Sequence, residues 1–132
     1  MTSESPAEHP NVALLRRIYA RDRDTFFRMV TPDYRCHTPG ASPVAGTVRG
    51  AEGMRRHIEQ GQELSGGTFR VTHQGFFLAD DRWGMVPVRL SGQRQGRTLD
   101  MAAFGIWRFV DGRIAEHWEN PLDIPAFDAF WS

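Results

Sequence analysis

The chain has 132 residues, of which 40% are hydrophobic and 24% charged, an ordinary globular composition that suffices for one hydrophobic core. Lysine plus arginine and aspartate plus glutamate both number 16, so the net charge is zero. This balance argues against nucleic-acid binding through a global basic field and against a polybasic membrane-surface protein. The single cysteine, Cys36, excludes an intrachain disulfide and a zinc site built from several thiolates.

The first nine residues are polar and lack the basic start and apolar stretch of a signal peptide. We expect a disordered leader over residues 1–9 and a single domain over residues 10–132. No apolar run approaches the ~20 residues that a membrane span requires. The sequence therefore predicts a soluble cytoplasmic protein without nucleic-acid or membrane partners.

The first half of the domain is predicted to be mainly helical. Asn11 is a suitable N-cap for a first helix, and Asp24 is a suitable N-cap for a short second helix. Residues 34–38 have the pattern of a short strand, and the proline and glycine residues within 39–50 predict a long, tightly turned loop. A third helix is expected over residues 51–64, where apolar residues recur on one face.

The second half is predicted to be β-structure. We expect strands over residues 68–78, 83–90, 97–110 and 113–119, with a polar loop at 92–96. Asp111-Gly112 is typical of a hairpin turn, and 14 consecutive strand residues before it favour a bent or bulged strand. These strands follow one another without intervening helices, which predicts an α+β fold. The apolar tail at 121–132 must be covered by its own domain or by a partner subunit.

A strongly bent sheet that is covered on one face by helices leaves a conical cavity suited to a small apolar ligand. The sequence supplies apolar residues for such a wall, although any single one of them is more often simply a core residue. The candidates are Phe26, Phe27, Met54, Met85, Met101, Phe104 and Trp107. We therefore expect a small apolar or polycyclic substrate as the partner.

Three segments resemble the SnoaL-like polyketide cyclase branch of the nuclear-transport-factor-2-like superfamily. They are HTPGASPVAGTVRG at residues 37–50, GGTFR at 66–70 and DGRIAEHWE at 111–119. The resemblance extends over about residues 10–131 and implies a cone-shaped curved mixed sheet wrapped by three helices, commonly in a homodimer. The superfamily includes cyclases, steroid isomerases, epoxide hydrolases, dehydratases and members without catalysis, so the fold alone does not fix the reaction.

The resemblance places a catalytic carboxylate near Glu119. A carboxylate inside an apolar cone would have a raised pKa and could act as a general acid or base near neutral pH. Strand alternation sends His117 to the same face and Glu116 and Trp118 to the other face. His117 is therefore a second candidate, because histidine titrates in the range needed for acid–base work. The alternatives are an exposed glutamate at a strand end and a structural histidine.

His37 is the third catalytic candidate, because the segment 34–39 resembles a family position where a polar residue enters the cavity before a proline. The alternative is that His37 braces the glycine-rich loop. Tyr34 and Tyr19 could each donate a phenolic hydrogen bond to a substrate oxygen, and Tyr34 lies nearer to a candidate site in the sequence. Cys36 alternates with His37 and is expected to be a buried, inert thiol.

The histidines show no spacing typical of a metal site, and no nucleotide-binding motif is present, so neither a metal nor another cofactor is expected. Two departures from the family pattern bear on function. The cyclases often carry a polar pair on the strand before the Asp-Gly turn, where this chain has Ala103 and Gly105. The epoxide hydrolases carry an arginine–carboxylate pair on a central strand, which residues 84–88 lack.

The expected function is a cofactor-independent cyclase or isomerase of natural-product biosynthesis that uses acid–base catalysis. Glu119 would transfer the proton, assisted by His37 or His117. An epoxide hydrolase or epoxide-opening cyclase would use the same residues. A non-catalytic protein that binds a ligand or a partner chain is the third hypothesis, since the polar set is incomplete.

Overall fold

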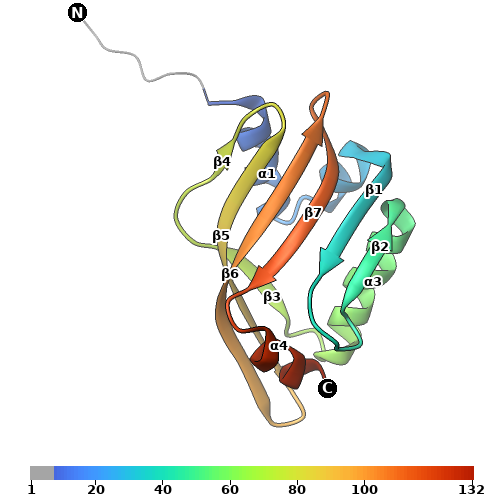
Figure 1. Ribbon diagram of the computed structural model, residues 1–132, viewed down its shortest axis with the longest axis vertical. Helices are drawn as coiled ribbons and strands as arrows, with labels where there is room; N and C mark the ends of the chain where they lie inside the picture. The colour runs from blue at the N-terminus through green and yellow to red at the C-terminus, as the bar shows by residue number, and fades with distance from the viewer. Residues whose placement is uncertain (1–7) are drawn as a thin grey trace, which may run out of the picture.

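A computed structural model describes residues 8–132 of the chain (Figure 1). Its elements are α1 (Pro10–Tyr19), α2 (Arg23–Met29), β1 (Val30–Thr38), β2 (Gly46–Arg49), α3 (Gly50–Leu64), β3 (Arg70–His73), β4 (Leu78–Ala79), β5 (Trp83–Arg94), β6 (Arg97–Val110), β7 (Arg113–Pro121) and α4 (Ile124–Trp131). The predicted α+β class is confirmed. The predicted leader falls largely on residues 1–7, which lie outside the described residues. No helix among residues 8–132 is both long and apolar enough to cross a membrane.

The strands form one curved, open sheet in the order β2-β1-β7-β6-β5-β3, with β4 paired to β5. All pairings are antiparallel except that of β1 with β7, which is parallel. The helices α1, α2 and α3 lie on one face of the sheet, and α4 lies across its lower end (Figure 1). The sheet therefore has an inner face toward the helices and an outer face.

Both predicted helix caps are displaced. The α1 helix begins after His9, whose Nδ1 accepts a hydrogen bond from the Asn11 backbone N–H at 3.0 Å. Asn11 is inside the helix and buried. The α2 helix is capped by Asp22 rather than Asp24, because the Asp22 carboxylate accepts both the N–H and the hydroxyl of Thr25, at 3.1 and 2.7 Å.

The β-structure of the second half also differs in its boundaries. The single strand expected over residues 68–78 is two short strands, β3 and β4. The expected loop at 92–96 is instead a tight hairpin, in which pairing continues to Arg94 and Arg97. Gln95 and Gly96 both have positive φ, which matches the right-handed twist of a long hairpin. Part of the expected loop at 39–50 pairs with β1 as β2.

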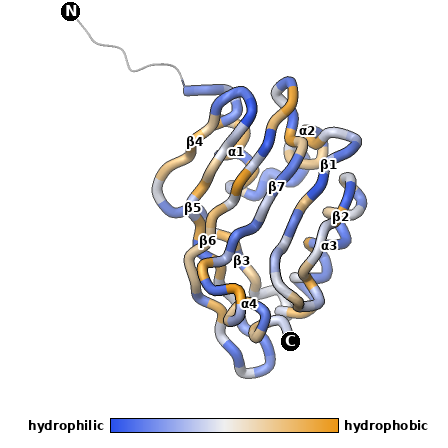
Figure 2. The backbone as a smooth tube through the Cα atoms, in the orientation of Figure 1, coloured by the Kyte–Doolittle hydropathy of each residue, from blue (hydrophilic) through white to orange (hydrophobic). Residues whose placement is uncertain are grey.

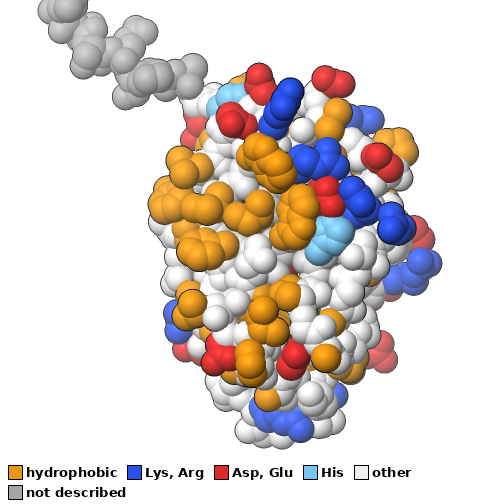
Figure 3. Space-filling view, in the orientation of Figure 1, with side chains coloured by type: hydrophobic (Ala, Val, Ile, Leu, Met, Phe, Trp, Pro, Cys, Tyr) orange, Lys and Arg blue, Asp and Glu red, His pale blue; other side chains and the backbone are white. Residues whose placement is uncertain are grey.

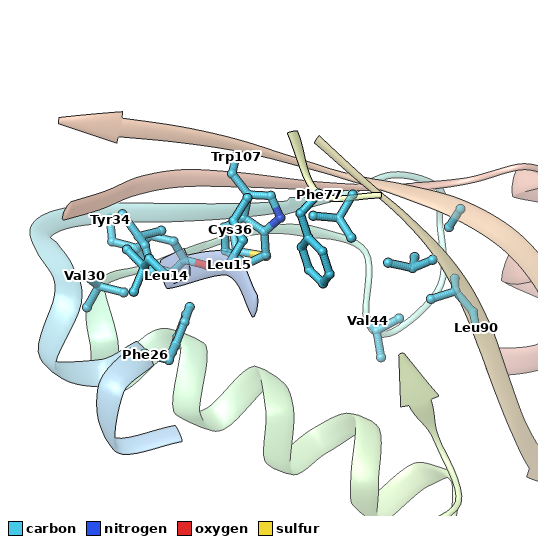
Figure 4. Packing of buried hydrophobic residues seen from close by; sticks show 14 of the residues in the cluster. Leu14, Leu15, Phe26, Val30, Tyr34, Cys36, Val44, Phe77, Leu90 and Trp107 are labelled. Carbon is cyan, nitrogen blue, oxygen red and sulfur yellow. The ribbon is translucent and has the colours of Figure 1, made fainter. Parts of the chain in front are cut away.

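The hydrophobic core lies between the inner face of the sheet and the helices. Figure 2 shows hydrophobic positions distributed along the strands and in α4. Figure 4 shows Phe26, Tyr34, Cys36 and Trp107 within the core cluster. The apolar tail folds back on its own domain as α4, which buries Phe127, Phe130 and Trp131. Pro125 occupies the first turn of this helix, where a missing N–H costs little.

Candidate active site

A cavity of about 380 Å³ lies between the inner face of the sheet and the helices, within the size range of small-molecule sites. Helices contribute most of its apolar wall, and polar groups enter it from both the sheet and the helices. The lining includes Ile18, Tyr19, Phe26, Phe27, Met54, His57 and Ile58 from α1, α2 and α3, Cys36, Trp107, His117 and Glu119 from the sheet, and Phe127 and Trp131 from α4.

Glu119 and His117 enter the cavity side by side from β7, as strand alternation predicts. His117 Nε2 lies 3.6 Å from Glu119 Oε2. Glu119 Oε1 and His117 Nε2 are both buried, and neither has a hydrogen-bond partner among residues 8–132. Such unsatisfied polar atoms are costly in a protein interior, which indicates that a ligand or water completes them.

The apolar surroundings of Glu119 shift the pKa of its carboxyl group upward. Burial raises the pKa of Glu119 from 4.5 to about 7, because the cavity wall solvates the carboxylate form poorly. Both protonation states are therefore populated near pH 7. A carboxyl group in this condition can accept a proton and return it at similar free-energy cost.

His117 is neutral in the folded protein. Burial, with smaller contributions from the charges of His57 and His37, lowers the pKa of His117 to about 3. The imidazole ring stacks on the indole of Trp107, with ring centroids 3.8 Å apart and planes 9° apart. Its Nδ1 lies 3.6 Å from the Cys36 sulfur. These contacts fix the ring so that Nε2 points toward Glu119 and the cavity.

Tyr19 brings a hydroxyl group into the same wall from α1. Its oxygen accepts a hydrogen bond from Trp107 Nε1 at 3.1 Å. Sequence position gave no reason to prefer Tyr19 over Tyr34. The helical pattern places Tyr19 one turn beyond the buried Leu15, and this was the available signal that it faces the sheet.

His37 lies on the outer face of the sheet, away from the cavity. Its Nε2 lies 2.5 Å from Glu116 Oε2, its Nδ1 lies 2.8 Å from Thr47 Oγ1, and its ring stacks on Trp118. Cys36, the alternating neighbour, faces inward instead. Position 37 therefore does not enter the cavity, and the structure brings together only two of the three predicted catalytic residues.

The predicted ligand-contacting residues divide between the cavity and other places in the fold. Those on the cavity wall are Phe26, Phe27, Met54 and Trp107. Phe104 alternates with the buried Ala103 and Gly105 and is 48% exposed on the outer face. Tyr34 is fully buried in the core behind the wall, where its hydroxyl has no partner among residues 8–132. Met85 alternates with the buried Gly84 and Val86 and thus faces outward. Met101 packs against the core, but it is not part of the cavity lining.

Among the residues that the structure describes, no group of three or more histidine, cysteine, aspartate or glutamate side chains is arranged to hold an ion. The polar side chains of the cavity lining include the carboxyl of Glu119, the imidazoles of His117 and His57 and the hydroxyl of Tyr19.

The family profile of the SnoaL-like domain matches residues 12–117, and the chain belongs to this family. The resemblance seen in the sequence is thereby confirmed. A search of curated proteins finds no match.

Solved structures share the fold across almost the whole chain. Bal32a, from a soil-derived mobile gene cassette, is 29% identical with a TM-score of 0.86, covering 93% of this chain and 97% of its own. A protein of unknown function with a cystatin-like fold, from Xanthomonas campestris, is 30% identical with a TM-score of 0.81, covering 92% and 96%. A protein from Jannaschia sp. CCS1, assigned as a SnoaL-like polyketide cyclase, is 21% identical with a TM-score of 0.71, covering 100% and 98%.

Proposed function

We propose that this protein is a cofactor-independent cyclase or isomerase that moves a proton on a small apolar substrate, with Glu119 as the proton-transfer group. One observation carries this proposal. The Glu119 carboxyl group lies in an apolar cavity with one oxygen unpartnered among residues 8–132, and burial raises its pKa to about 7.

The Glu119 carboxylate would remove a proton from a carbon next to a carbonyl group, and the resulting acid would return the proton to the product. Neutral His117, whose Nε2 lies 3.6 Å from Glu119 Oε2, would orient the carboxyl group. The aromatic walls would hold a polycyclic substrate in a reactive conformation, so that positioning supplies much of the rate. Membership of the SnoaL-like family and the cyclase assignment of the Jannaschia relative support a natural-product substrate.

Proton exchange at an activated carbon tests this proposal without knowledge of the natural substrate. We would follow deuterium incorporation at the carbons next to the carbonyl of 2-tetralone in D₂O by NMR. Wild-type protein should accelerate exchange over buffer, and Glu119→Gln should lower that acceleration ~10²–10⁴-fold. Glu116→Gln is the matched control on the outer face of the same strand and should retain activity. Equal rates for wild type and Glu119→Gln would contradict the role of Glu119.

A non-catalytic ligand carrier is the second candidate, since Ala103 and Gly105 contribute no proton-transfer group to the inner face. Unchanged 2-naphthol binding together with exchange no faster than buffer would favour the carrier. An epoxide-opening reaction would reveal itself by incorporation of ¹⁸O from water into the product of a test epoxide.

We also propose a homodimer. Figure 3 shows hydrophobic side chains gathered on the outer face of the sheet. Leu78, Trp83 and Phe104, from β4, β5 and β6, are 54%, 49% and 48% exposed. A contiguous apolar surface of this kind is typical of an interface. Sedimentation equilibrium should give twice the mass of the chain, whereas a monomer at all concentrations would contradict the proposal.

A further inference from the structure

Two arginines mark the place where the cavity meets solvent. Of the lining residues that the structure describes, only Arg21 and Arg23 are exposed. They flank Asp22 in the turn that joins α1 to α2, so the mouth of the cavity lies at this turn. A ligand that extends from Glu119 to the mouth therefore ends beside two guanidinium groups.

Both arginines occupy positions that local preferences disfavour. Arg21 has a φ of 65°, in the left-handed region where a side chain is strained and glycine is the usual residue. Arg23 is the first residue of α2, and a positive charge is unfavourable at a helix N-terminus. Positions that depart from local preferences in this way cluster at functional sites. The chain therefore keeps two positive charges at the mouth at a cost to local stability.

These two charges are not neutralised by carboxylates. Within the described part of the chain, neither Arg21 nor Arg23 forms an ion pair. Asp22 lies between them in the sequence, but its carboxylate accepts hydrogen bonds from Thr25 at 3.1 and 2.7 Å and pairs with Arg17 at 3.2 Å. Those contacts occupy Asp22, so both guanidinium groups keep their donors for another partner.

A third arginine lines the cavity from β3 and is held in place by the backbone. Arg70 Nη1 donates to the carbonyl oxygens of Gly67 and Phe69, both at 2.8 Å. No carboxylate among residues 8–132 pairs with it. The lining thus carries three arginines against two acidic residues, one of which, Glu119, has a raised pKa. Walls of low polarity focus such a field on a bound ligand.

We propose that the cavity binds an organic acid: a ring-containing apolar ligand whose carboxylate lies at the mouth between Arg21 and Arg23 while its rings extend toward Glu119. The inference rests on the proposed function and deepens it, because it names the chemical class of the substrate. The guanidinium group offers a carboxylate two parallel N–H donors, and such charge-assisted bonds are stronger than neutral ones. The carboxylate and the reacting carbonyl group then lie at opposite ends of the substrate, which keeps the anion away from Glu119.

Two naphthalene compounds with the same rings test the anion site. At pH 7, 2-naphthoate is ionised and 2-naphthol is neutral. In isothermal titration calorimetry at low salt, wild-type protein should bind 2-naphthoate about tenfold more tightly than 2-naphthol. About 0.5 M sodium chloride should remove most of this preference, because salt screens charges at an exposed mouth. Equal affinities for the two compounds at low salt would overturn the proposal.

Removal of both charges locates the site. Arg21→Gln/Arg23→Gln should weaken 2-naphthoate binding about tenfold and 2-naphthol binding less than twofold. Arg56→Gln is the matched control, because Arg56 is exposed on α3 and lies outside the cavity lining. This control should bind 2-naphthoate as wild type does. A double variant that retains the preference for 2-naphthoate, or a control that loses it, would overturn the proposal.

Arg21→Gly separates binding from folding. Glycine adopts a φ of 65° without strain, so the midpoint of thermal unfolding should equal or exceed that of wild type. Binding of 2-naphthoate should nevertheless weaken about threefold. A residue kept only for structure predicts a lower midpoint with unchanged affinity, and that result would overturn the role of Arg21.

Failure of this proposal and failure of the proposed function are distinguishable. If wild-type protein prefers 2-naphthoate but does not accelerate exchange of 2-tetralone, the anion site is supported and only the catalytic role of Glu119 falls. If wild-type protein accelerates the exchange but binds 2-naphthoate no better than 2-naphthol, the anion site is overturned and the proposed function stands.

Discussion

Glu116 and Glu119 are three residues apart on β7, yet they lie on opposite faces of the sheet and in opposite electrostatic environments. Burial tends to raise the pKa of Glu116, but hydrogen bonds with His37 and Arg108 outweigh it and lower the pKa overall. Glu119 has only the burial contribution, and its pKa is about 7. One strand thus carries a carboxylate with a lowered pKa outward and a carboxyl group with a raised pKa inward.

Glu119→Gln should change the pH dependence of folding stability in a defined direction. The wild-type folded state retains a proton on Glu119 between about pH 4.5 and 7 that the unfolded chain has released, so the contribution of Glu119 to stability falls as pH rises through this range. The variant has no such loss. Its free energy of unfolding, relative to wild type, should rise by up to about 3 kcal/mol from pH 4.5 to pH 8.

Urea denaturation at half-unit pH intervals measures this difference. His117 titrates in both proteins, so the difference between the two curves isolates Glu119. Parallel curves would show that the folded-state pKa of Glu119 is not raised.

Glu116→Gln should destabilise the protein at neutral pH. Glu116 Oε1 lies 3.0 Å from Arg108 Nε and 3.3 Å from Arg35 Nη2, and its side chain is only 8% exposed. Removing the charge leaves two arginines facing a neutral amide, at an expected cost of about 1–3 kcal/mol. Because the folded-state pKa is lowered, the contribution is present above the unfolded pKa and is lost as pH falls through the folded value.

The effect of Glu116→Gln should therefore be largest near pH 7 and shrink below about pH 4. Asp100→Asn is the control, since Asp100 pairs with Arg89 at a site where both side chains are half-exposed. Its cost should stay within about 0.5 kcal/mol. A difference between Glu116→Gln and wild type that is constant down to pH 3 would rule out the ion-pair explanation.

Two glycine-to-alanine changes should act in opposite directions. A Cβ at Gly84 would lie 2.9 Å from both Leu15 Cδ1 and Phe109 Cε2, which are buried and cannot move freely, so Gly84→Ala should cost about 1–3 kcal/mol. A Cβ at Gly53, inside α3, would lie 3.7 Å from the Val48 Cβ, an ordinary contact. Gly53→Ala should therefore stabilise by about 0.5–1 kcal/mol through helix propensity. Thermal melts of both variants check the direction of each stability change. A stabilised Gly84→Ala protein would show that the packing of Leu15 and Phe109 around Gly84 is loose.

Cys36 should be unreactive in the folded protein. Burial raises the pKa of the Cys36 thiol to about 12, and the residue is 3% exposed. Labelling by a disulfide reagent at pH 8 should be on the order of 10³-fold slower than in urea-unfolded protein, because it requires opening of the structure. Rapid labelling of the folded state would show instead that the cavity admits the reagent to the sulfur.

Much of the fold was predictable because the second half of the chain follows strong local rules. The strand expected over residues 97–110 has the bounds of β6, and Asp111-Gly112 forms the turn before β7. Residues 121–132 were not recognised as α4. The α4 helix is short and is stabilised by burying its apolar side chains against residues distant in the chain, such as Phe69. The local sequence does not reveal such contacts.

The site was predictable only in part, because the sequence does not show which face of a strand is turned toward the cavity. Alternation shows that Cys36 and His37 face opposite ways, but not which of them faces inward. That choice depends on the register of β1 against β7, where Cys36 pairs with His117. A register between strands so far apart in the chain is set by tertiary packing, so the sequence pattern alone does not reveal it.

The parallel pairing of β1 with β7 means that the cavity can form only late in folding, after the last strand has joined the sheet. Cys36 and His117 are neighbours in space and 81 residues apart in the chain, so the final strand must insert between β1 and β6 before the wall is complete. Closing so long a loop carries an entropic cost that is recovered only by contacts made afterwards, and such topologies fold slowly. On the ribosome, the aromatic faces of α2 and β1 therefore emerge well before anything covers them. A nascent chain of this protein should engage chaperones until β7 has left the exit tunnel.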